Sequence, residues 1–318
     1  KGNKSAKKMK NTKKANFAAI VLAAGVGKRM QSKKSKVLHK INGQPMIRKT
    51  VQTLLNVCPK EIIVVANNNN LKDLKSILGK SVSYTVQFKP LGTANATHIG
   101  NEALKSDSQN VAILYGDDTA FYTPQTLKKV FDKHIKSKAK ITFVTILKKD
   151  PKGLGRILRK DGQLIAIMEE KDATQAQKKI IEVNDGLYFF NKDYLNKNLK
   201  RIEPSKATQE LYLTDLIAIA LKDKAKVETF TISDEGEWHG INTQLELAKA
   251  NLRLNNKIHF MGIAGSGTSS VASIAQAYGF IVTGCDLTPN SSYLGKNTIK
   301  IEKGHNKNHL NDKACLIV

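Results

Sequence analysis

Short apolar runs alternate with amphipathic segments from Asn16 to about residue 150. This alternation is typical of an α/β protein whose sheet is mostly parallel. The predicted strands are residues 17–23, 61–65, 83–87, 111–115 and 140–146. The predicted helices between them are residues 46–56, 71–78, 93–104 and 124–135.

The pattern then changes. Residues 155–159 and 163–169, separated by Asp161 and Gly162, predict a β-hairpin. A strand at 183–190, a helix at 214–221, a strand at 227–232 and a helix at 242–252 follow.

A new buried strand at 257–263 begins a second unit, with a helix to about residue 278 and a strand at 280–285. Residues 314–318 read as the opening of a further strand, so we expect this unit to be incomplete. The chain is therefore divided into a disordered basic tail (1–15), a first domain (16–255) and a truncated second domain (256–318).

Charge and composition bear on the choice of partner. The net charge is +25 over 318 residues, with seven lysines in residues 1–14 and the others scattered. Few aromatic side chains accompany them, so nucleic acid is not the expected partner. The longest apolar stretch, residues 17–27, is too short to span a membrane. Three widely spaced cysteines and no secretory signal favour the cytoplasm. The oligomeric state is left open.

The first candidate site begins where the first strand ends, in the segment 22–30. Gly25 and Gly27 permit a tight turn with bare backbone N–H groups, and Arg29 and Lys36 add positive charge. A strand, a glycine loop and basic residues together predict a triphosphate cradle. A glycine turn alone would be weak support, since many α/β loops contain one.

Two further strand ends carry polar groups. Gln87 opens a loop to Ala94 with an amide suited to a base edge. Tyr115 is followed by Gly116, Asp117 and Asp118, where a carboxylate at the sheet edge is well placed for Mg²⁺. Asp117 could instead be a turn or N-cap residue, and Asp118 could equally be the metal ligand.

Taken in order, these segments resemble the nucleotidyltransferase domain of the N-acetylglucosamine-1-phosphate uridylyltransferases. The resemblance runs over about residues 16–255 and implies a Rossmann-like domain. It rests on residues 22–30, 36–39, 87–94, 115–117, 153–157, 169–174, 183–186, 210–215 and 240–247.

The resemblance implies a role for each matching position. Nucleotide binding would fall to Leu22, Ala23, Ala24, Gly25, Gln87, Gly92 and Thr93. Arg29 and Lys36 would be catalytic and stabilise phosphate charge, and Asp117 with Asn242 would bind Mg²⁺. The sugar would contact Tyr115, Gly155, Glu169, Asn184 and Tyr212. Considered singly, Asn242 reads as a helix N-cap and Glu169 as a solvated hairpin residue.

The chain also departs from that family. Ser35 replaces a common proline, Asp118-Thr-Ala replaces the usual proline-leucine, and Lys206 stands where asparagine is common. The reaction type is therefore better supported than the identity of the sugar.

The second candidate site is the loop 262–270 with the acidic residue Asp286 at the end of the next strand. Its residues are Gly262, Gly265, Ser266, Gly267 and Asp286. One interpretation is a dinucleotide site with Asp286 on a ribose. The fuller string, including residues 259–262, 285–287 and 304–306, resembles the N-terminal domain of UDP-N-acetylmuramate–L-alanine ligases. That resemblance implies a second site for a UDP-amino sugar. We expect no ligase activity, because the resemblance covers only about residues 256–318 and the Gly-Lys-Thr phosphate loop of the ATP-binding domain of these ligases is not present.

The leading hypothesis is an enzyme that joins UMP from UTP to N-acetylglucosamine 1-phosphate for peptidoglycan precursor synthesis. Two alternatives stay open: a transferase for another sugar 1-phosphate or for CTP, and a non-catalytic module that only binds UDP-sugars.

Overall fold

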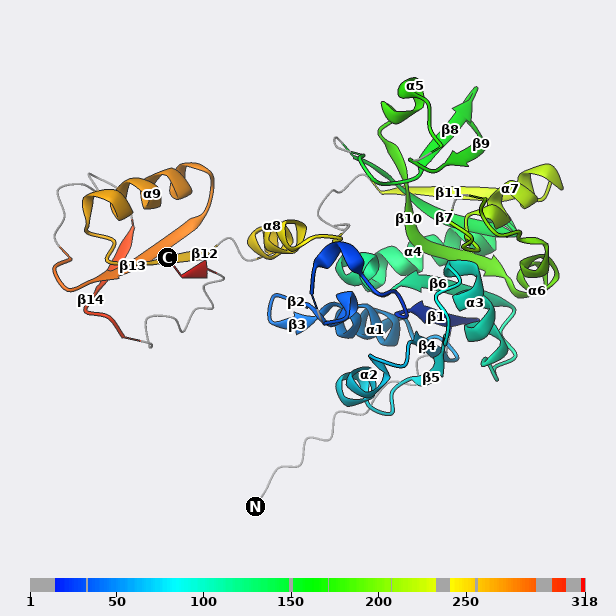
Figure 1. Cartoon of the computed structure of the whole chain (residues 1–318), viewed down its shortest axis with the longest axis horizontal. Coiled ribbons are helices and arrows are strands. Elements are labelled where there is room, and N and C mark those ends of the chain that lie inside the picture. The colour runs from blue at the N-terminus through cyan, green and yellow to red at the C-terminus, as the bar shows by residue number, and fades with distance from the viewer. Residues whose placement is uncertain are drawn as a thin grey trace, which may run out of the picture. The chain divides into compact units, whose positions relative to one another are not determined.

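The computed structural model describes residues 15–32, 34–148, 151–170, 172–206, 208–232, 241–254, 257–289, 299–306 and 316–317. The chain divides into two compact units. Figure 1 shows the chain coloured by residue number from the N-terminus to the C-terminus. Unit 1 comprises residues 1–39 and 45–240, and unit 2 comprises residues 40–44 and 241–318. Residues 1–14 of the predicted tail lie outside the described residues. Ala15 is already in register with Pro59 in a β-bridge.

A nine-stranded sheet forms the centre of unit 1. Seven strands follow one path in the order β11-β7-β10-β6-β1-β4-β5. Their bounds are β1 (Phe17–Leu22), β4 (Ile62–Ala66), β5 (Ser83–Val86), β6 (Asn110–Tyr115), β7 (Ile141–Leu147), β10 (Glu182–Asn191) and β11 (Val227–Ile232). Only β10 on this path runs antiparallel to its neighbours, which confirms the predicted mostly parallel α/β fold.

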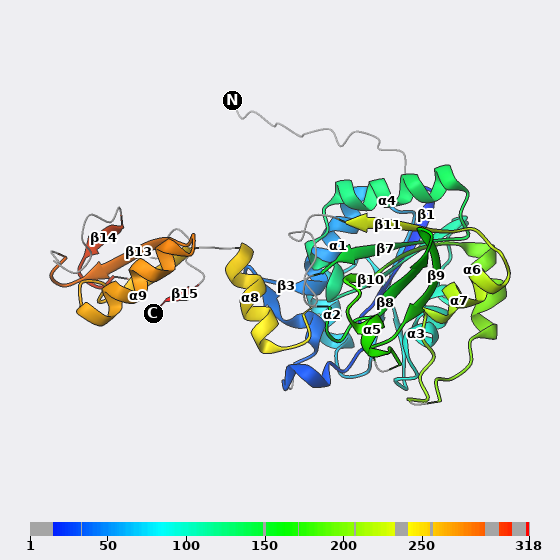
Figure 2. The same ribbon diagram turned by 90° about the horizontal axis from the view of Figure 1, so that it is seen from above.

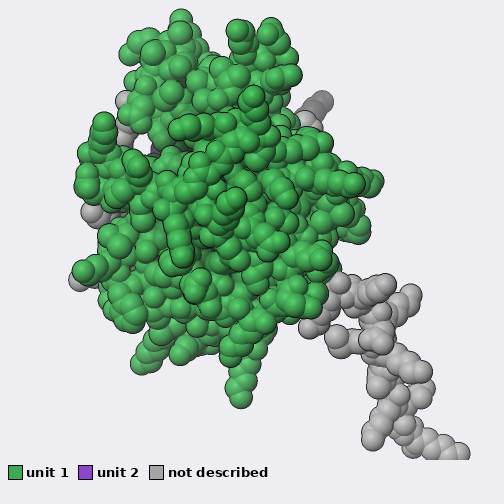
Figure 3. All heavy atoms as spheres, turned by 90° about the vertical axis from the view of Figure 1, so that its right-hand side faces the viewer, with its two compact units in different colours: residues 1–39, 45–240 green, residues 40–44, 241–318 purple. Residues whose placement is uncertain are grey.

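Helices cover both faces of this sheet (Figures 1 and 2). One face carries α1 (Met46–Val57), α2 (Leu71–Leu78) and α4 (Pro124–Ser137), and the other carries α3 (Thr93–Glu102), α6 (Lys192–Asn198) and α7 (Asp215–Lys222). Successive side chains of a strand point to opposite faces, so β1 contributes Phe17, Ala19 and Val21 to one core and Ile20 and Leu22 to the other. A continuous apolar run is what a strand buried on both faces requires. In space-filling view, unit 1 is a closely packed body (Figure 3).

The predicted hairpin is present as β8 (Arg156–Lys160) and β9 (Gln163–Met168). Asp161 and Gly162 have φ values of 50° and 77°, the left-handed pair that a two-residue hairpin turn favours. The short helix α5 (Gln175–Lys178) follows, and a capping box between Thr174 and Gln177 stabilises its N-terminus.

The helices α5 and α6 and the strand at Lys300–Lys303 were not predicted. Several other short elements had no periodic signal and were not predicted either. They are η1 (Lys28–Met30), η2 (Lys36–Leu38), β2 (Lys40–Ile41), β3 (Gln44–Pro45), η3 (Asp118–Phe121) and η4 (Leu199–Arg201).

Unit 2 contains a four-stranded parallel sheet in the order β14-β13-β12-β15. The strands are β12 (Lys257–Met261), β13 (Ile281–Asp286), β14 (Lys300–Lys303) and β15 (Leu316–Ile317), with helix α9 (Ser266–Ala277) between the first two. Ile258, Phe260, Ile263, Ala272 and Val282 form its core. The helix α8 (Gln244–Leu254) also belongs to unit 2, where Asn251 Oδ1 accepts a hydrogen bond of 2.8 Å from Asn42 N.

Among the described residues, no helix combines the length and apolar character needed to cross a bilayer.

His134 of α4 is a buried histidine in unit 1. Its Nε2 lies 3.2 Å from Asn110 Oδ1 and its Nδ1 lies 2.9 Å from Thr142 Oγ1. Because the Asn110 oxygen can only accept, Nε2 carries the proton and Nδ1 accepts from the threonine hydroxyl. Burial lowers the pKa of His134 to about 4.

We therefore expect acid to destabilise unit 1 through this ring. Below a pH of about 6.5 the unfolded chain binds a proton that the folded protein excludes, so stability falls as the pH drops towards about 4. The loss due to His134 is on the order of 3 kcal/mol. Urea unfolding at several pH values should give a shallower pH dependence for His134→Gln than for the wild type or for a control at the exposed His98. Equal slopes in the three proteins would contradict this role.

Candidate active site

Two asparagine side chains donate hydrogen bonds to the backbone of the loop that follows β1. Asn70 Nδ2 donates to Ala23 O and Asn67 Nδ2 donates to Ala24 O, each at 2.8 Å. Ala23 and Ala24 are buried, whereas Gly25 is exposed and a Cβ there would meet no atom within 4 Å. The loop thus keeps a fixed backbone beneath an open surface, as an anion cradle requires.

Sequence reasoning missed these two asparagines. They belong to the polar run 67–70 directly after β4, and this position at the sheet edge was the available signal. Asn70 Nδ2 also donates to Ser35 Oγ at 3.0 Å. Asn70 thus links the glycine loop to Ser35, the residue before Lys36 that departs from the family pattern.

Lys36 joins this loop to the end of β6. A Cβ on Gly27, which has a φ of 65°, would lie only 2.8 Å from the Lys36 Cβ. The Lys36 ammonium forms an ion pair with Asp117 Oδ2 and lies 3.9 Å from Asp118 Oδ1. Asp117 is the N-cap residue of η3, as the alternative interpretation of this residue expected, but its side chain makes no capping hydrogen bond, so the carboxylate is available to Lys36.

The charges in this cluster depend on one another. Burial alone lowers the pKa of Lys36, but the carboxylates of Asp117 and Asp118 outweigh it and hold the pKa above its usual value. Burial, followed by the repulsion of Asp117, raises the pKa of Asp118 to about 7. Arg29 on η1 adds positive charge that acts on both Lys36 and Asp118. The cluster is therefore a buried pair of acidic side chains whose negative charge one lysine offsets only in part.

The Mg²⁺ that the resemblance implies can be tested against these oxygen atoms. Asp118 Oδ1 is buried and has no hydrogen-bond partner among the described residues. The neighbouring Asp185 is already engaged, since its carboxylate accepts from Tyr122 Oη and Gly186 N. Proteins commonly hold Mg²⁺ with one or two carboxylates, completed by substrate phosphates and water. Asp117 and Asp118 fit such an ion.

Within the part of the chain that the structure describes, no three His, Cys, Asp or Glu side chains form a metal cage. A two-carboxylate site for a phosphate-bound cation needs none.

Asn242 belongs to unit 2, whereas Asp117 belongs to unit 1. The helix α8 is capped by Thr243, whose Oγ1 accepts from Glu246 N at 3.2 Å, while Glu246 Oε2 accepts from Thr243 N at 2.9 Å. The N-cap interpretation of Asn242 is therefore wrong, because the chain places the cap one residue later. Its role as a metal ligand stays a prediction.

Gln87 lies at the end of β5 with its side chain buried. Its Nε2 donates to Gly92 O at 3.1 Å and to Asn95 Oδ1 at 2.9 Å. Both amide protons are thus used within the protein, and the described residues supply no hydrogen bond to the amide oxygen. Oε1 can accept from a base N–H but cannot donate.

Gly92 and Thr93 begin α3 and contact the segment around Leu211. Ala94 N donates to Leu211 O at 2.9 Å, and Thr93 Oγ1 accepts from Leu213 N at 3.0 Å. Gly92 has a φ of 100°, and a Cβ there would lie 2.5 Å from Leu211 O. The need for glycine at this position is set by the backbone of the neighbouring segment.

Gly92→Ala should therefore lower the free energy of unfolding by at least about 2 kcal/mol, combining left-handed strain with a backbone clash. Gly79 is a matched control, because it has a φ of 61° and open space around its Cβ position. Gly79→Ala should cost less, on the order of 1–2 kcal/mol, from the backbone strain alone. Equal shifts in thermal melting would show that the Leu211 contact is unimportant.

Four of the five amino acids predicted to bind the sugar lie close together. Asn184 N donates to Gly155 O at 2.9 Å, and a Cβ on Gly155 would lie 3.4 Å from Glu169 Oε1. Asn184 Nδ2 donates to Tyr188 Oη at 2.7 Å, and the Tyr188 ring lies 6.1 Å from that of Tyr115. Asn184 Oδ1 is buried without a hydrogen-bond partner in the described structure.

Glu169 is not the solvated hairpin residue considered above. Burial, with smaller contributions from Asp215 and Asp172, raises the pKa of its carboxyl group. A partly buried carboxylate beside the orphan amide oxygen of Asn184 suits a ligand rich in hydroxyl groups. The fifth residue, Tyr212, binds Thr208 Oγ1 through its hydroxyl at 2.7 Å. It adjoins Leu211, which packs on Gly92.

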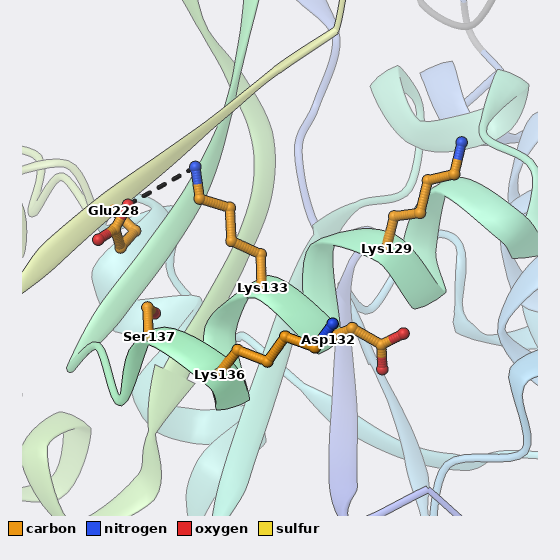
Figure 4. A pocket seen from close by; sticks show the side chains of 6 residues that line it. All are labelled: Lys129, Asp132, Lys133, Lys136, Ser137 and Glu228. Carbon is orange, nitrogen blue, oxygen red and sulfur yellow. Dashed lines mark ion pairs between the residues drawn. The ribbon is translucent and has the colours of Figure 1, made fainter.

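A charged hollow elsewhere on unit 1 is separate from this site. Figure 4 shows its lining on α4 and β11, with an ion pair of 3.6 Å between Lys133 and Glu228. This hollow is a shallow surface depression of about 500 Å³, lined by Lys129, Asp132, Lys133, Lys136, Ser137 and Glu228. No predicted site residue lines it.

The second candidate site forms in unit 2 between β12 and α9. Gly262 has a φ of 67°, and Gly265 is the N-cap of α9, followed by Ser266 and Gly267. Asp286 Oδ2 accepts from Ala264 N and its Oδ1 accepts from Thr288 N, each at 2.9 Å. These backbone hydrogen bonds, that of Thr288 first, lower the pKa of Asp286. Asp286 thus supports the glycine loop from the neighbouring strand.

The fold and the first site define a class. Residues 18–257 match the nucleotidyl transferase family, and the chain belongs to that family. Residues 257–318 match the Mur ligase family, catalytic domain.

The relatives and a solved structure agree with that class. A bifunctional protein GlmU of Desulfotalea psychrophila is 34% identical over 258 residues, covering 79% of this chain and 76% of that protein. The bifunctional proteins GlmU of Mycobacterium marinum and Thermoanaerobacter pseudethanolicus are 35% and 38% identical, covering 78% and 77% of this chain. The chain spans about half the length of these two, 52% and 53%.

A crystal structure described as a glucose-1-phosphate thymidylyltransferase from Bacillus anthracis has a TM-score of 0.64 at 23% identity. It covers 74% of this chain and 94% of that one, and this likeness concerns the fold alone.

Proposed function

We propose that unit 1, with Asn242, transfers UMP from UTP to N-acetylglucosamine 1-phosphate, releasing pyrophosphate. The observation that carries this proposal is the cluster of Lys36, Asp117 and Asp118 beside the glycine loop 23–27, at the carboxyl edge of the sheet. Open α/β sheets bind their ligands at this edge. The GlmU relatives and the resemblance described above support the substrate pair.

The reaction needs no nucleophile from the protein. An oxygen of the sugar phosphate attacks the α-phosphorus of UTP, and the bond to pyrophosphate breaks. Arg29 and Lys36 would neutralise the charge that develops on the phosphates, so positioning and electrostatics supply the catalysis. Asp117, Asn242 and the adjacent Asp118 would hold Mg²⁺, which supplies Lewis-acid stabilisation of the phosphate oxygens.

The choice of base would depend on Gln87. Its amide oxygen is left as an acceptor, which fits the N3–H of uracil and not the unprotonated N3 of cytosine. The nucleotide would lie on the loop residues Leu22, Ala23, Ala24 and Gly25. Gly92 and Thr93 would contact its other side. Tyr115, Gly155, Glu169, Asn184 and Tyr212 would bind the sugar phosphate.

For unit 2, we propose a binding site for a UDP-amino sugar at Gly262, Gly265, Ser266 and Gly267, held by Asp286. The likeness to Mur ligases supports this assignment. The domain boundary near residue 255 and a cytoplasmic location are part of the same proposal.

A pyrophosphate-release assay tests the transfer reaction. UTP, dTTP and CTP are each combined with N-acetylglucosamine 1-phosphate or glucose 1-phosphate, with and without EDTA. We expect the highest kcat/KM for UTP with the N-acetylated sugar, and no turnover with EDTA. A preference for glucose 1-phosphate or for CTP would favour a related transferase. Binding without turnover for every pair would favour a non-catalytic UDP-sugar module.

A further inference from the structure

The Lys36 ammonium occupies the space between two carboxylates. It is ion-paired with Asp117 and lies 3.9 Å from the Asp118 Oδ1 atom, which no hydrogen bond satisfies within the described residues. The side chains of Lys36, Asp117 and Asp118 are only 11%, 16% and 19% exposed. The positive charge of the lysine thus fills the position that best suits a divalent cation.

Two cations cannot share this position. A magnesium ion lies about 2.0–2.1 Å from its oxygen ligands, so an ammonium on the same carboxylate would be only a few ångströms from it. At that separation the repulsion between positive charges in a partly buried site is large. Arg29 already opposes the charge of Lys36 from nearby.

The stem of Lys36 allows its ammonium to move while its base stays fixed. The Cβ of Lys36 packs directly against Gly27 in the glycine loop. Three further methylene groups separate this Cβ from the ammonium, so the ammonium can move from the carboxylates towards an anion held by the loop.

We propose that Lys36 is a placeholder cation: in the substrate-free protein it occupies the divalent-cation position between Asp117 and Asp118, and it leaves for the substrate phosphates when the cation binds. This inference rests on the proposed function, from which it takes the cation and the phosphates. Its consequence is linkage. Lys36 competes with the cation in the absence of nucleotide and ceases to compete once a triphosphate attracts it, so cation and triphosphate strengthen each other's binding.

Mn²⁺ binding to the substrate-free chain tests the competition, with free Mn²⁺ measured by electron paramagnetic resonance. We expect Lys36→Met to bind Mn²⁺ about tenfold more tightly than the wild type, because the competing charge is gone. Lys34→Met is the matched control: it removes the same charge from an exposed residue nearby and should change the affinity less than twofold. Adding Asp118→Asn to Lys36→Met should reverse the gain.

A second measurement uses the wild type, so it does not depend on how a variant folds. An amine-reactive reagent labels lysines, and mass spectrometry compares Lys36 with Lys34 with and without Mn²⁺. We expect Mn²⁺ to raise the labelling rate of Lys36 severalfold and to leave that of Lys34 unchanged.

Unchanged or weaker Mn²⁺ binding by Lys36→Met would overturn the proposal, as would unchanged Lys36 labelling in Mn²⁺-saturated wild type. Failure of the wild type and every variant to bind Mn²⁺ would overturn it too. The proposed function is judged separately, by pyrophosphate release. A chain that turns over but gives these negative results would keep its function and lose the placeholder lysine.

Discussion

Replacing Asp117 by asparagine should lower the kcat of UMP transfer by about a thousandfold or more, the loss expected when a ligand of a catalytic metal is removed. Asparagine keeps the size of the side chain but removes the charge that holds the Lys36 ammonium and that would bind Mg²⁺. The carboxylate does not cap η3 through a hydrogen bond, so the fold should survive. Steady-state pyrophosphate release over a range of Mg²⁺ concentrations measures the effect.

Asp132→Asn is the matched control for this variant. Asp132 is an exposed carboxylate on α4 that pairs with Lys128 at 2.7 Å, outside the proposed site. It should retain wild-type turnover, and both variants should keep a near-normal melting temperature. Near-normal turnover of Asp117→Asn at saturating Mg²⁺ would remove this residue from the metal site.

Arg29→Ala should lower kcat about a hundredfold while changing the KM for the sugar phosphate little. Arg29 is exposed on η1, so its removal leaves the core intact. A Cβ on Gly153 would lie 3.7 Å from an Nη of Arg29, which places the guanidinium close to the segment leading into β8. We attribute its effect to charge that builds up as pyrophosphate leaves.

Arg48→Ala, at an exposed position of α1, controls for the loss of one positive charge and should leave kcat unchanged. Arg29→Lys should recover only part of the rate, because an ammonium lacks the two-pronged geometry of guanidinium. A higher KM for the sugar phosphate with an unchanged kcat would contradict a role in the chemical step.

Strong periodic signals predicted the main elements of the fold. The buried strand β1 and the amphipathic helix α2 stand where the pattern of apolar residues put them. The short helices η1, η2 and η3 were missed, because three or four residues carry no periodicity and only the tertiary environment stabilises them. The direction of β10 was also beyond the pattern, since a strand buried on both faces is apolar in either orientation.

The candidate site, like the fold, could be predicted from the sequence only in part. Sequence alone pointed to the glycine loop, to Lys36 and to either Asp117 or Asp118 at the edge of the sheet, and the family resemblance chose Asp117. It did not indicate that Lys36 pairs with Asp117, that Asp118 Oδ1 has no hydrogen-bond partner among the described residues, or that Asn70 supports the loop. Each of these facts depends on contacts between segments that are tens of residues apart in the chain.

The sequence by itself determined the α/β class, the order of the main elements and the edge of the sheet at which the chemistry lies. These follow from local periodicity and from the geometry that all parallel sheets share. Only the tertiary structure decided how the amide protons of Gln87 are used, which carboxylate oxygen has no hydrogen-bond partner among the described residues and where the lysine charge is placed. Hydrogen-bond satisfaction, burial and charge are properties of the surroundings of a residue, and folding brings those surroundings together from distant parts of the chain.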